Sequence, residues 1–206
     1  RAGVIPCGGV AAEIRAGTEG RVPICFDKDN NPAGAFSYLP LDVYTGLPFH
    51  VNGNFLLQPN RRHLWGKASS ASKVKQGGEF ETNWNVCLME EVLSKALINL
   101  LLDLHTLQAN DFIDGREFQT LWPKMQRTES DFHPIVEAFY KAVGNRNKEE
   151  APPLIFNGTK WVSIHDCFFI EQALCASPIA GDIKTVLNLD LHPKKWVNLD
   201  SDVLLS

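Results

Sequence analysis

Residues 34–65, GAFSYLPLDVYTGLPFHVNGNFLLQPNRRHLW, decide the fold class because they join two β-rich stretches through turn residues. The sequence Thr45-Gly46-Leu47-Pro48 breaks the chain between the two stretches. A polar loop with paired arginines follows the second stretch and ends at Trp65. This order indicates a sheet whose last strand runs directly into a charged loop.

The second stretch has the alternation of a half-buried strand. Phe49, Val51 and Phe55 stand at odd positions, as they would on one face of a strand. Asn52-Gly53 is expected to interrupt this strand as a bulge or a tight turn.

A hairpin is predicted upstream of this region. Residues 21–26 form one strand, residues 27–32 supply Asp, Asn and Pro for a turn, and residues 35–41 return. The Gly-rich residues 1–20 look like the end of a preceding unit and a short linker.

The strongest helical pattern covers residues 84–108. One apolar stripe follows helical steps, and a second set of apolar residues lies beside it: Leu88, Val92, Ala96, Asn99 and Leu100, with Met89, Leu93, Leu97, Leu101 and Leu104. So broad a stripe predicts a helix that packs against a sheet. Glu91 and Lys95 are expected to pair on its outer face.

A second helix is predicted over residues 132–143. Ser130 or Asp131 can cap it, Pro134 suits its first turn and Gly144 can end it. Residues 112–121 give a weaker helical pattern.

The C-terminal part is expected to be small. Residues 154–156 and 161–164 form a hairpin around Asn157-Gly158. Residues 165–176 are expected to be a short helix and residues 186–189 a strand.

Together these elements predict an α/β fold of the α+β type, with a mixed sheet packed by a long amphipathic helix. We expect a linker at residues 1–20, an α/β domain at 21–145, and a hairpin and helix extension at 146–206 of the same domain.

The bulk composition excludes several classes of protein. A formal net charge of −4 and 21% charged residues do not suggest a nucleic-acid or membrane-surface binder. No stretch has the apolar length of a membrane span. The chain starts at Arg without Met, and we interpret it as a piece of a larger polypeptide.

The five cysteines carry no metal-binding or disulfide pattern. None is spaced as CxxC, and four lie in apolar sequence: Cys25, Cys87, Cys167 and Cys175. This is typical of reduced, buried thiols in a cytosolic protein, so we expect a cytoplasmic location and no zinc site. The sequon at Asn157 is then expected to be accidental.

No signature of an autonomous enzyme is present. The sequence has no GxxxxGK[ST] loop, no GxGxxG after a strand, no GxSxG and no HExxH. His165-Asp166-Cys167 places a base, an acid and a thiol in sequence, but adjacent residues of a helix do not face one another. We therefore interpret this triplet as structural, with catalysis by Cys167 or a histidine ranked last.

Arg61 and Arg62 form the sharpest polar pair. A guanidinium at a loop can bind a phosphate oxygen or a carboxylate, or can form a structural salt bridge, and both readings stay open. Downstream, Lys67, Lys73 and Lys75 either extend an anion-attracting patch or keep a loop solvated. The tryptophans are expected to anchor packing, although an exposed Trp84 or Trp122 would instead mark a protein-binding surface.

The phrase YLPLDVYTGLPFHVNGNFLLQPNRRHLW resembles the sacsin repeat family, as do the segments IPCGGVAAEI and FNGTKWVSIHDCFF. The resemblance spans most of the chain. In that family the phrase follows an ATP-binding module of the GHKL type, related to the ninety-kilodalton heat-shock chaperone. The resemblance therefore implies the second, middle-type domain of a GHKL ATPase, in which a strand precedes a long amphipathic helix.

The resemblance also implies a function. The chain is expected to be a non-catalytic part of an ATP-linked chaperone or co-chaperone that acts in protein folding or assembly. Its expected partners are the adjoining nucleotide domain, client proteins and other chaperones. Arg61, Arg62 and Lys67 are candidate sensors of the γ-phosphate.

We expect no cofactor in the chain itself, and ATP and magnesium in the adjoining domain. The alternative is a protein-interaction scaffold module without nucleotide coupling. Burial of Arg61 and Arg62 in salt bridges would favour that alternative.

Overall fold

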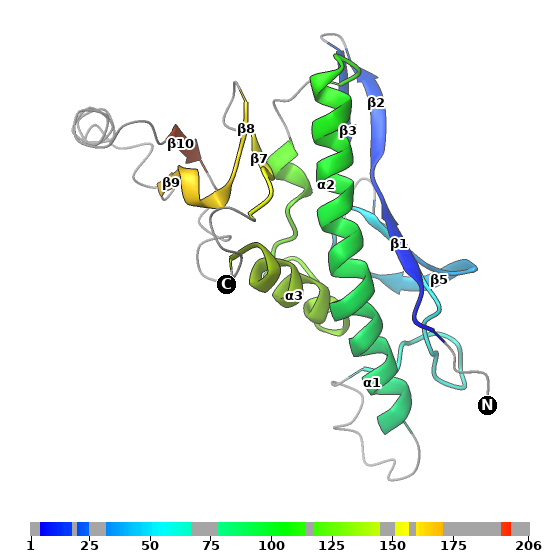
Figure 1. The fold of residues 1–206 in the computed structure, drawn as a ribbon. Coiled ribbons are helices and arrows are strands. Elements are labelled where there is room, and N and C mark those ends of the chain that lie inside the picture. The colour runs from blue at the N-terminus through cyan, green and yellow to red at the C-terminus, as the bar shows by residue number, and fades with distance from the viewer. Residues whose placement is uncertain are drawn as a thin grey trace.

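The structure is a computed structural model that describes residues 5–17, 20–24, 32–66, 78–113, 118–144, 151–156, 160–170 and 195–198. It is a mixed α/β fold with a four-stranded mixed sheet, a long helix and a second helix (Figure 1). The predicted fold class is therefore confirmed.

The main sheet has the strand order β1-β6-β4-β5. Its strands are β1 (Gly8–Ala11), β4 (Gly34–Ser37), β5 (Leu39–Tyr44) and β6 (His50–Gly53). β6 pairs antiparallel with β1 and parallel with β4, and β5 pairs antiparallel with β4. The parallel pair makes the sheet mixed, as expected.

β1 lies within the segment that we expected to be a linker. Gly8 pairs with Gly53 and Val10 pairs with Val51, so this stretch is an edge strand of the sheet. The small residues at its start allow a close approach, since a Cβ at Gly8 would lie 2.6 Å from the carbonyl oxygen of Asn52. The Gly-rich composition that suggested a linker thus serves strand packing.

The predicted pairing of residues 21–26 with 35–41 is wrong. β3 (Gly20–Ile24) instead pairs with β2 (Glu13–Gly17), with only two residues between the strands. A two-residue connection closes a hairpin with less loss of chain entropy than the six-residue turn that we expected. β4 correspondingly turns back into β5 through a single residue, Tyr38.

β6 confirms the predicted alternation and corrects one detail. Phe49, Val51 and Phe55 are all buried. Asn52 and Gly53, however, are regular strand residues paired with β1, so no bulge or turn interrupts the strand there. Gly53 packs closely against the long helix, since a Cβ there would lie 3.0 Å from the Leu88 side chain.

The long helix is continuous from Glu79 to Ala109. It consists of α1 (Glu79–Cys87), a π-helical segment η2 (Leu88–Leu93) and α2 (Ser94–Ala109). Figure 1 shows it between the strands and α3 (His133–Gly144). The predicted helix at 84–108 is confirmed and begins five residues earlier, at Glu79.

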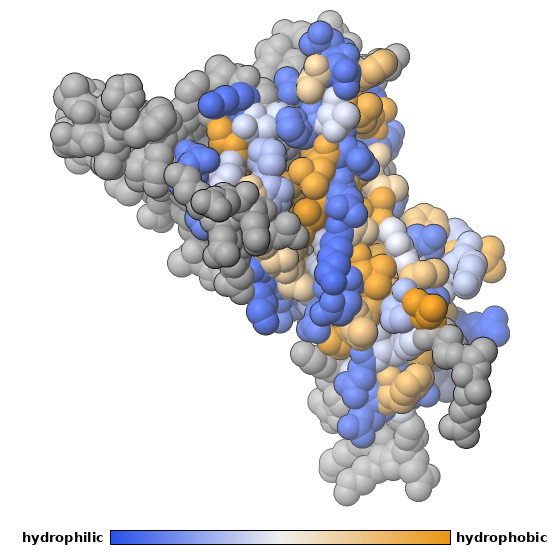
Figure 2. All heavy atoms as spheres, in the orientation of Figure 1, coloured by the Kyte–Doolittle hydropathy of each residue, from blue (hydrophilic) through white to orange (hydrophobic). Residues whose placement is uncertain are grey.

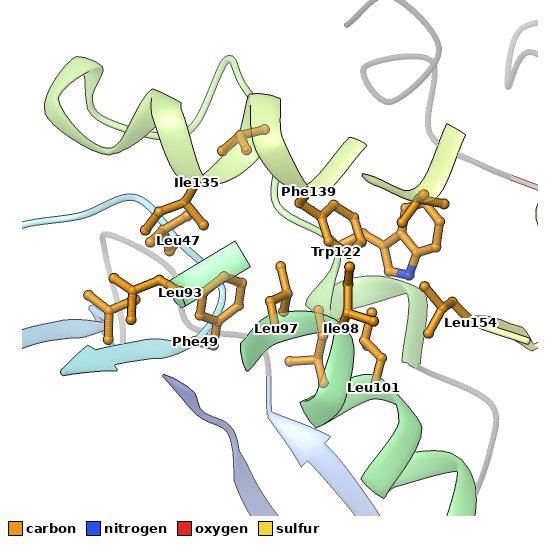
Figure 3. Close-up of a cluster of buried hydrophobic side chains, with 14 of the residues drawn as sticks. Leu47, Phe49, Leu93, Leu97, Ile98, Leu101, Trp122, Ile135, Phe139 and Leu154 are labelled. Carbon is orange, nitrogen blue, oxygen red and sulfur yellow. The ribbon is translucent and has the colours of Figure 1, made fainter. Parts of the chain in front are cut away.

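The buried face of this helix includes the second predicted set together with Leu88 of the first. Leu93, Leu97 and Leu101 are fully buried, whereas Asn99 is exposed. Figure 3 shows these leucines packed with Phe49 from the sheet side and with Ile135 and Phe139 from α3. Because α2 contacts both β1 and α3, its apolar surface must be broad.

The outward face of the helix is hydrophilic. Figure 2 shows a polar band along it, and Glu91, Lys95, Asn99 and Asp103 are exposed on this side. Lys95 Nζ donates a 2.8 Å hydrogen bond to Glu91 Oε2, which confirms the predicted ion pair and lowers the pKa of Glu91.

α3 confirms the second predicted helix, with a 3₁₀ turn η4 (Ser130–Phe132) leading into it. Of the weaker helix predicted at 112–121, the described residues contain only the 3₁₀ turn η3 (Phe118–Leu121), and residues 114–117 lie outside the described part. α2 ends shortly before, at Ala109, and the chain then turns at Asn110 and Asp111, where Asp111 has φ of 58°.

The small C-terminal hairpin is confirmed as β7 (Ile155–Phe156) with β8 (Trp161–Val162). The helix predicted at 165–176 is wrong over its first part, where η5 (Ile164–Asp166) leads into strand β9 (Cys167–Ile170). β9 pairs parallel with β10 (Lys195–Asn198), and its Phe-Phe-Ile sequence suits a strand. The strand predicted at 186–189 lies outside the described residues.

Candidate functional site

The candidate site is the loop of residues 57–64, here called the arginine loop. It carries Arg61 and Arg62 and follows directly from β6 through Asn54, Phe55 and Leu56. Its ends meet in an antiparallel bridge between Leu57 and Leu64. The loop therefore extends from the end of β6 and is closed at its base by this bridge.

Hydrogen bonds of the backbone and of two side chains order the loop between these ends. Gln58 N donates to His63 O at 2.9 Å, and Gln58 Nε2 donates to Leu64 O at 3.2 Å. At the tip, Arg61 N donates to Gln58 O at 2.8 Å, and Arg62 N donates to Asn60 Oδ1 at 2.9 Å. The Gln-Pro-Asn sequence thus forms a compact turn, because Pro fixes φ and Asn bonds the backbone two residues on.

Arg61 and Arg62 are both exposed. Arg61 has φ of 56°, the left-handed region that a side chain of this size rarely adopts. Because both side chains are exposed, neither arginine is buried in a salt bridge. Such burial would have favoured the scaffold alternative. Both arginines are exposed on an ordered turn, where another molecule can reach them.

Asn85 of α1 holds the base of the arginine loop. This side chain is 1% exposed. Its Oδ1 accepts a hydrogen bond from Leu56 N at 2.8 Å, and its Nδ2 donates to Leu56 O at 2.8 Å and to Trp65 O at 2.9 Å. The amide group thus bonds both legs of the loop.

Two tryptophans strengthen the same junction. Trp84 Nε1 donates a 2.9 Å hydrogen bond to Asn54 O. The Trp65 ring covers Gly78, where a Cβ would lie 2.4 Å from the ring and φ is 118°. α1 and the arginine loop are therefore joined by packing and by hydrogen bonds.

His63 and Asp131 lie at a hollow beside the loop. A cavity of about 280 Å³ is lined by residues of β5, of the loop and of the turn before α3: Asp42, Val43, Tyr44, His63, Leu64, Glu129, Ser130, Asp131 and Phe132. Partial burial raises the pKa of Asp131, while the charge of His63 opposes this shift and that of Glu129 adds to it. A Cβ at Gly66 would lie 2.3 Å from Asp131 Oδ1, so this carboxyl lies against the end of the loop.

Other predicted site residues are not brought to this place. Lys67, with Lys73 and Lys75, lies outside the described residues. His165 and Asp166 lie in a 3₁₀ turn, and Cys167 begins β9, so the triplet is not helical as expected.

The tryptophan expectation is confirmed at Trp122, whereas the cysteine expectation is wrong at Cys87. Trp122 is buried against Phe139 and Tyr140, which removes it as a surface marker. Trp84 is only partly buried, beside the exposed Phe80. Cys87 was expected to be buried but is exposed, because it lies on the outward face of the helix one turn before Glu91.

Asn85 was missed from the sequence. The signal was present, because Asn85 precedes Leu88 and Met89 by one helical turn and so belongs to the buried face. A polar residue at such a position must find hydrogen-bond partners, and a loop backbone is the natural source.

Neither a metal centre nor a membrane span is found in the described part. Within it, no three His, Cys, Asp or Glu side chains gather in an arrangement that would hold a metal ion. None of the described helices has the length and apolar character required to cross a bilayer.

The fold and the loop define a mixed α/β domain that presents a pair of arginines. Comparison with curated proteins finds human sacsin, which is 26% identical over 174 residues, covering 84% of this chain and 4% of sacsin. The resemblance to sacsin predicted from the sequence is therefore confirmed. No protein-family model matches the chain, and no solved structure matches it.

Proposed function

We propose that this chain is a middle-type domain of a sacsin repeat and couples an adjoining GHKL-type nucleotide domain to the binding of client proteins. The similarity to human sacsin supports the repeat assignment, although the chain spans only 4% of that protein. In this proposal the adjoining domain binds ATP and magnesium. The protein that contains both domains acts in the cytoplasm, in protein folding or assembly.

The observation that carries the coupling is the exposure of Arg61 and Arg62 on an ordered loop. In phosphoryl transfer, negative charge on the transferred group is stabilised by positioned cations, and an arginine supplied by a second domain can serve this purpose. A guanidinium can donate two parallel hydrogen bonds to phosphate oxygens. The two arginines meet this requirement because their loop is held from both ends.

The proposal is tested by ATP hydrolysis of a polypeptide that contains this chain and its nucleotide domain. We expect Arg61→Ala or Arg62→Ala to lower kcat by about 10²–10³-fold, as the loss of one transition-state donor does. Arg127→Ala, at another exposed arginine, is the matched control and should leave the rate unchanged. The isolated chain should show no turnover.

An unchanged rate in both arginine variants would remove these residues from the mechanism. Turnover by the isolated chain, abolished by either substitution, would overturn the non-catalytic assignment.

The second candidate function is a protein-interaction scaffold without nucleotide coupling. It is favoured by Tyr38 and Leu39 at the β4–β5 turn, which are 87% and 73% exposed. Large apolar side chains exposed side by side are typical of interaction surfaces. Normal hydrolysis in the arginine variants, together with loss of client binding in Tyr38→Ser with Leu39→Ser, would establish this candidate instead.

A further inference from the structure

We infer that Asn85 is the positioning residue that fixes the arginine loop relative to the long helix, so that movement of the helix is carried to Arg61 and Arg62. This inference rests on the proposed function for its meaning, although the attachment of the loop can be tested without any activity. Asn85 itself touches no substrate.

The first support is the hydrogen-bond pattern. Asn85 exchanges two bonds of 2.8 Å with the N–H and C=O of Leu56, the exchange that a residue of a neighbouring strand would make. Its third bond goes to Trp65 O on the opposite leg. A single side chain of α1 therefore replaces a strand partner for the base of the loop.

The second support is that these bonds are protected from water. Asn85 is 1% exposed, so its amide loses its hydrogen bonds to solvent on folding and must keep those to the loop. Leu56 and Trp65 are also paired with each other, since Trp65 N donates to Leu56 O at 3.2 Å. The two legs therefore move as one unit with the helix.

The third support is the place of Asn85 in the helix. It lies in the last turn of α1, just ahead of the π-helical segment η2 that packs against β1 and α3. A π-helical segment changes the register of the residues on either side of it and often occurs at functional sites. A shift of α1 along or around its axis would act on the loop through Asn85 rather than through the sheet.

Trypsin provides the direct test because it cleaves after arginine in a chain that opens locally. Cleavage by protease follows the population of the opened state when opening is fast. We expect Asn85→Ala to speed cleavage after Arg61 and Arg62 by about tenfold or more, as the loss of buried hydrogen bonds implies. Asn83→Ala, at an exposed position of the same helix, is the matched control and should leave the rate unchanged.

Cleavage after Lys141, which is exposed in α3, serves as an internal reference. Release of the loop alone raises cleavage at the arginines and not at Lys141, whereas global unfolding raises both. Should Asn85→Ala unfold the chain, Asn85→Leu removes the same three bonds with a side chain of similar size and is read in the same way. Unchanged cleavage after the arginines in a folded variant would overturn the inference.

Hydrolysis by the longer polypeptide separates this inference from the proposed function. If both hold, Asn85→Ala lowers kcat as the arginine variants do and leaves the KM for ATP unchanged. Faster cleavage with normal hydrolysis in all three variants would uphold the attachment by Asn85 and reject the phosphate role. Unchanged cleavage in Asn85→Ala, together with impaired ATP hydrolysis in the two arginine variants, would reject the attachment by Asn85 and uphold the phosphate role.

Discussion

Single polar residues hold the loops of this protein in place. Thr45 is fully buried; its Oγ1 accepts a hydrogen bond from Leu47 N at 3.1 Å, and its carbonyl oxygen accepts one from Glu129 N at 3.0 Å. Asn85 does the same for the arginine loop. Buried polar groups of this kind are costly unless they are paired, so each ties one loop to one neighbour. Asp131 differs because its carboxyl is only partly buried.

Asp131 should make the stability of the protein depend on pH. Burial raises its pKa above the ordinary value of 3.8, so the folded state binds more protons than the unfolded state just above that pH. The free energy of unfolding is therefore expected to fall as the pH rises from 3.8 through the raised pKa. Asp131→Asn should lose this part of the dependence.

The measurement is denaturant unfolding of wild type and variant at several pH values between 3.5 and 7, a range chosen around the ordinary carboxyl pKa of about 3.9. Asp103→Asn, at an exposed position of α2, controls for the loss of one negative charge. A constant difference between wild type and Asp131→Asn over this range would contradict the prediction.

At the scale of elements, the sequence predicts the long helix and α3 better than the strand pairs of the main sheet. The long helix follows from its own periodicity, which is local. Its buried face could not be chosen from the sequence alone, because both the sheet and α3 cover it and η2 changes the register between Leu88 and Leu93. The hairpin of β2 and β3 was missed because Gly17 and Gly20, which flank its two-residue connection, were assigned to a linker.

The packing of the long helix predicts unequal effects for neighbouring leucines. Leu97 is fully buried between the sheet and α3, so Leu97→Ala should lower the free energy of unfolding by about 2–5 kcal/mol. Leu100 is only partly buried, and Leu100→Ala should cost clearly less. Urea denaturation of both variants checks this order, and an equal or reversed cost would contradict the burial of Leu97 against the sheet and α3.

At the scale of the whole molecule, contacts between distant segments decide the topology. β6 has β1 on one side and β4 on the other, and β1 lies about 40 residues before it in the sequence. Such pairing leaves no local signal, because each strand need only present an edge and a compatible face. The polar loop with its two arginines was predictable from the sequence, whereas its attachment depends on Asn85, Leu56 and Trp65, which meet only in the fold.

The role of β1 can be tested with two adjacent glycines, since residues 1–20 are either a linker or part of the domain. A Cβ at Gly8 would lie 2.6 Å from Asn52 O and 2.8 Å from the Leu93 side chain, whereas a Cβ at Gly9 meets nothing within 4 Å. Gly8→Ala should therefore lower the free energy of unfolding by about 1–3 kcal/mol, as overpacking does. Gly9→Ala should change it by less than about 0.5 kcal/mol.

Both substitutions place the same methyl group on the same strand, so composition and helix or strand propensity cancel in the comparison. If β1 were a linker that contacts neither β6 nor the long helix, the two variants would unfold at the same urea concentration. A lower midpoint for Gly8→Ala alone would mean that the N-terminal strand, the sheet and the helix that holds the arginine loop unfold together. Gly8 packs against Leu93 in the same continuous helix whose Asn85 bonds the base of the arginine loop, which is why these parts are expected to unfold together.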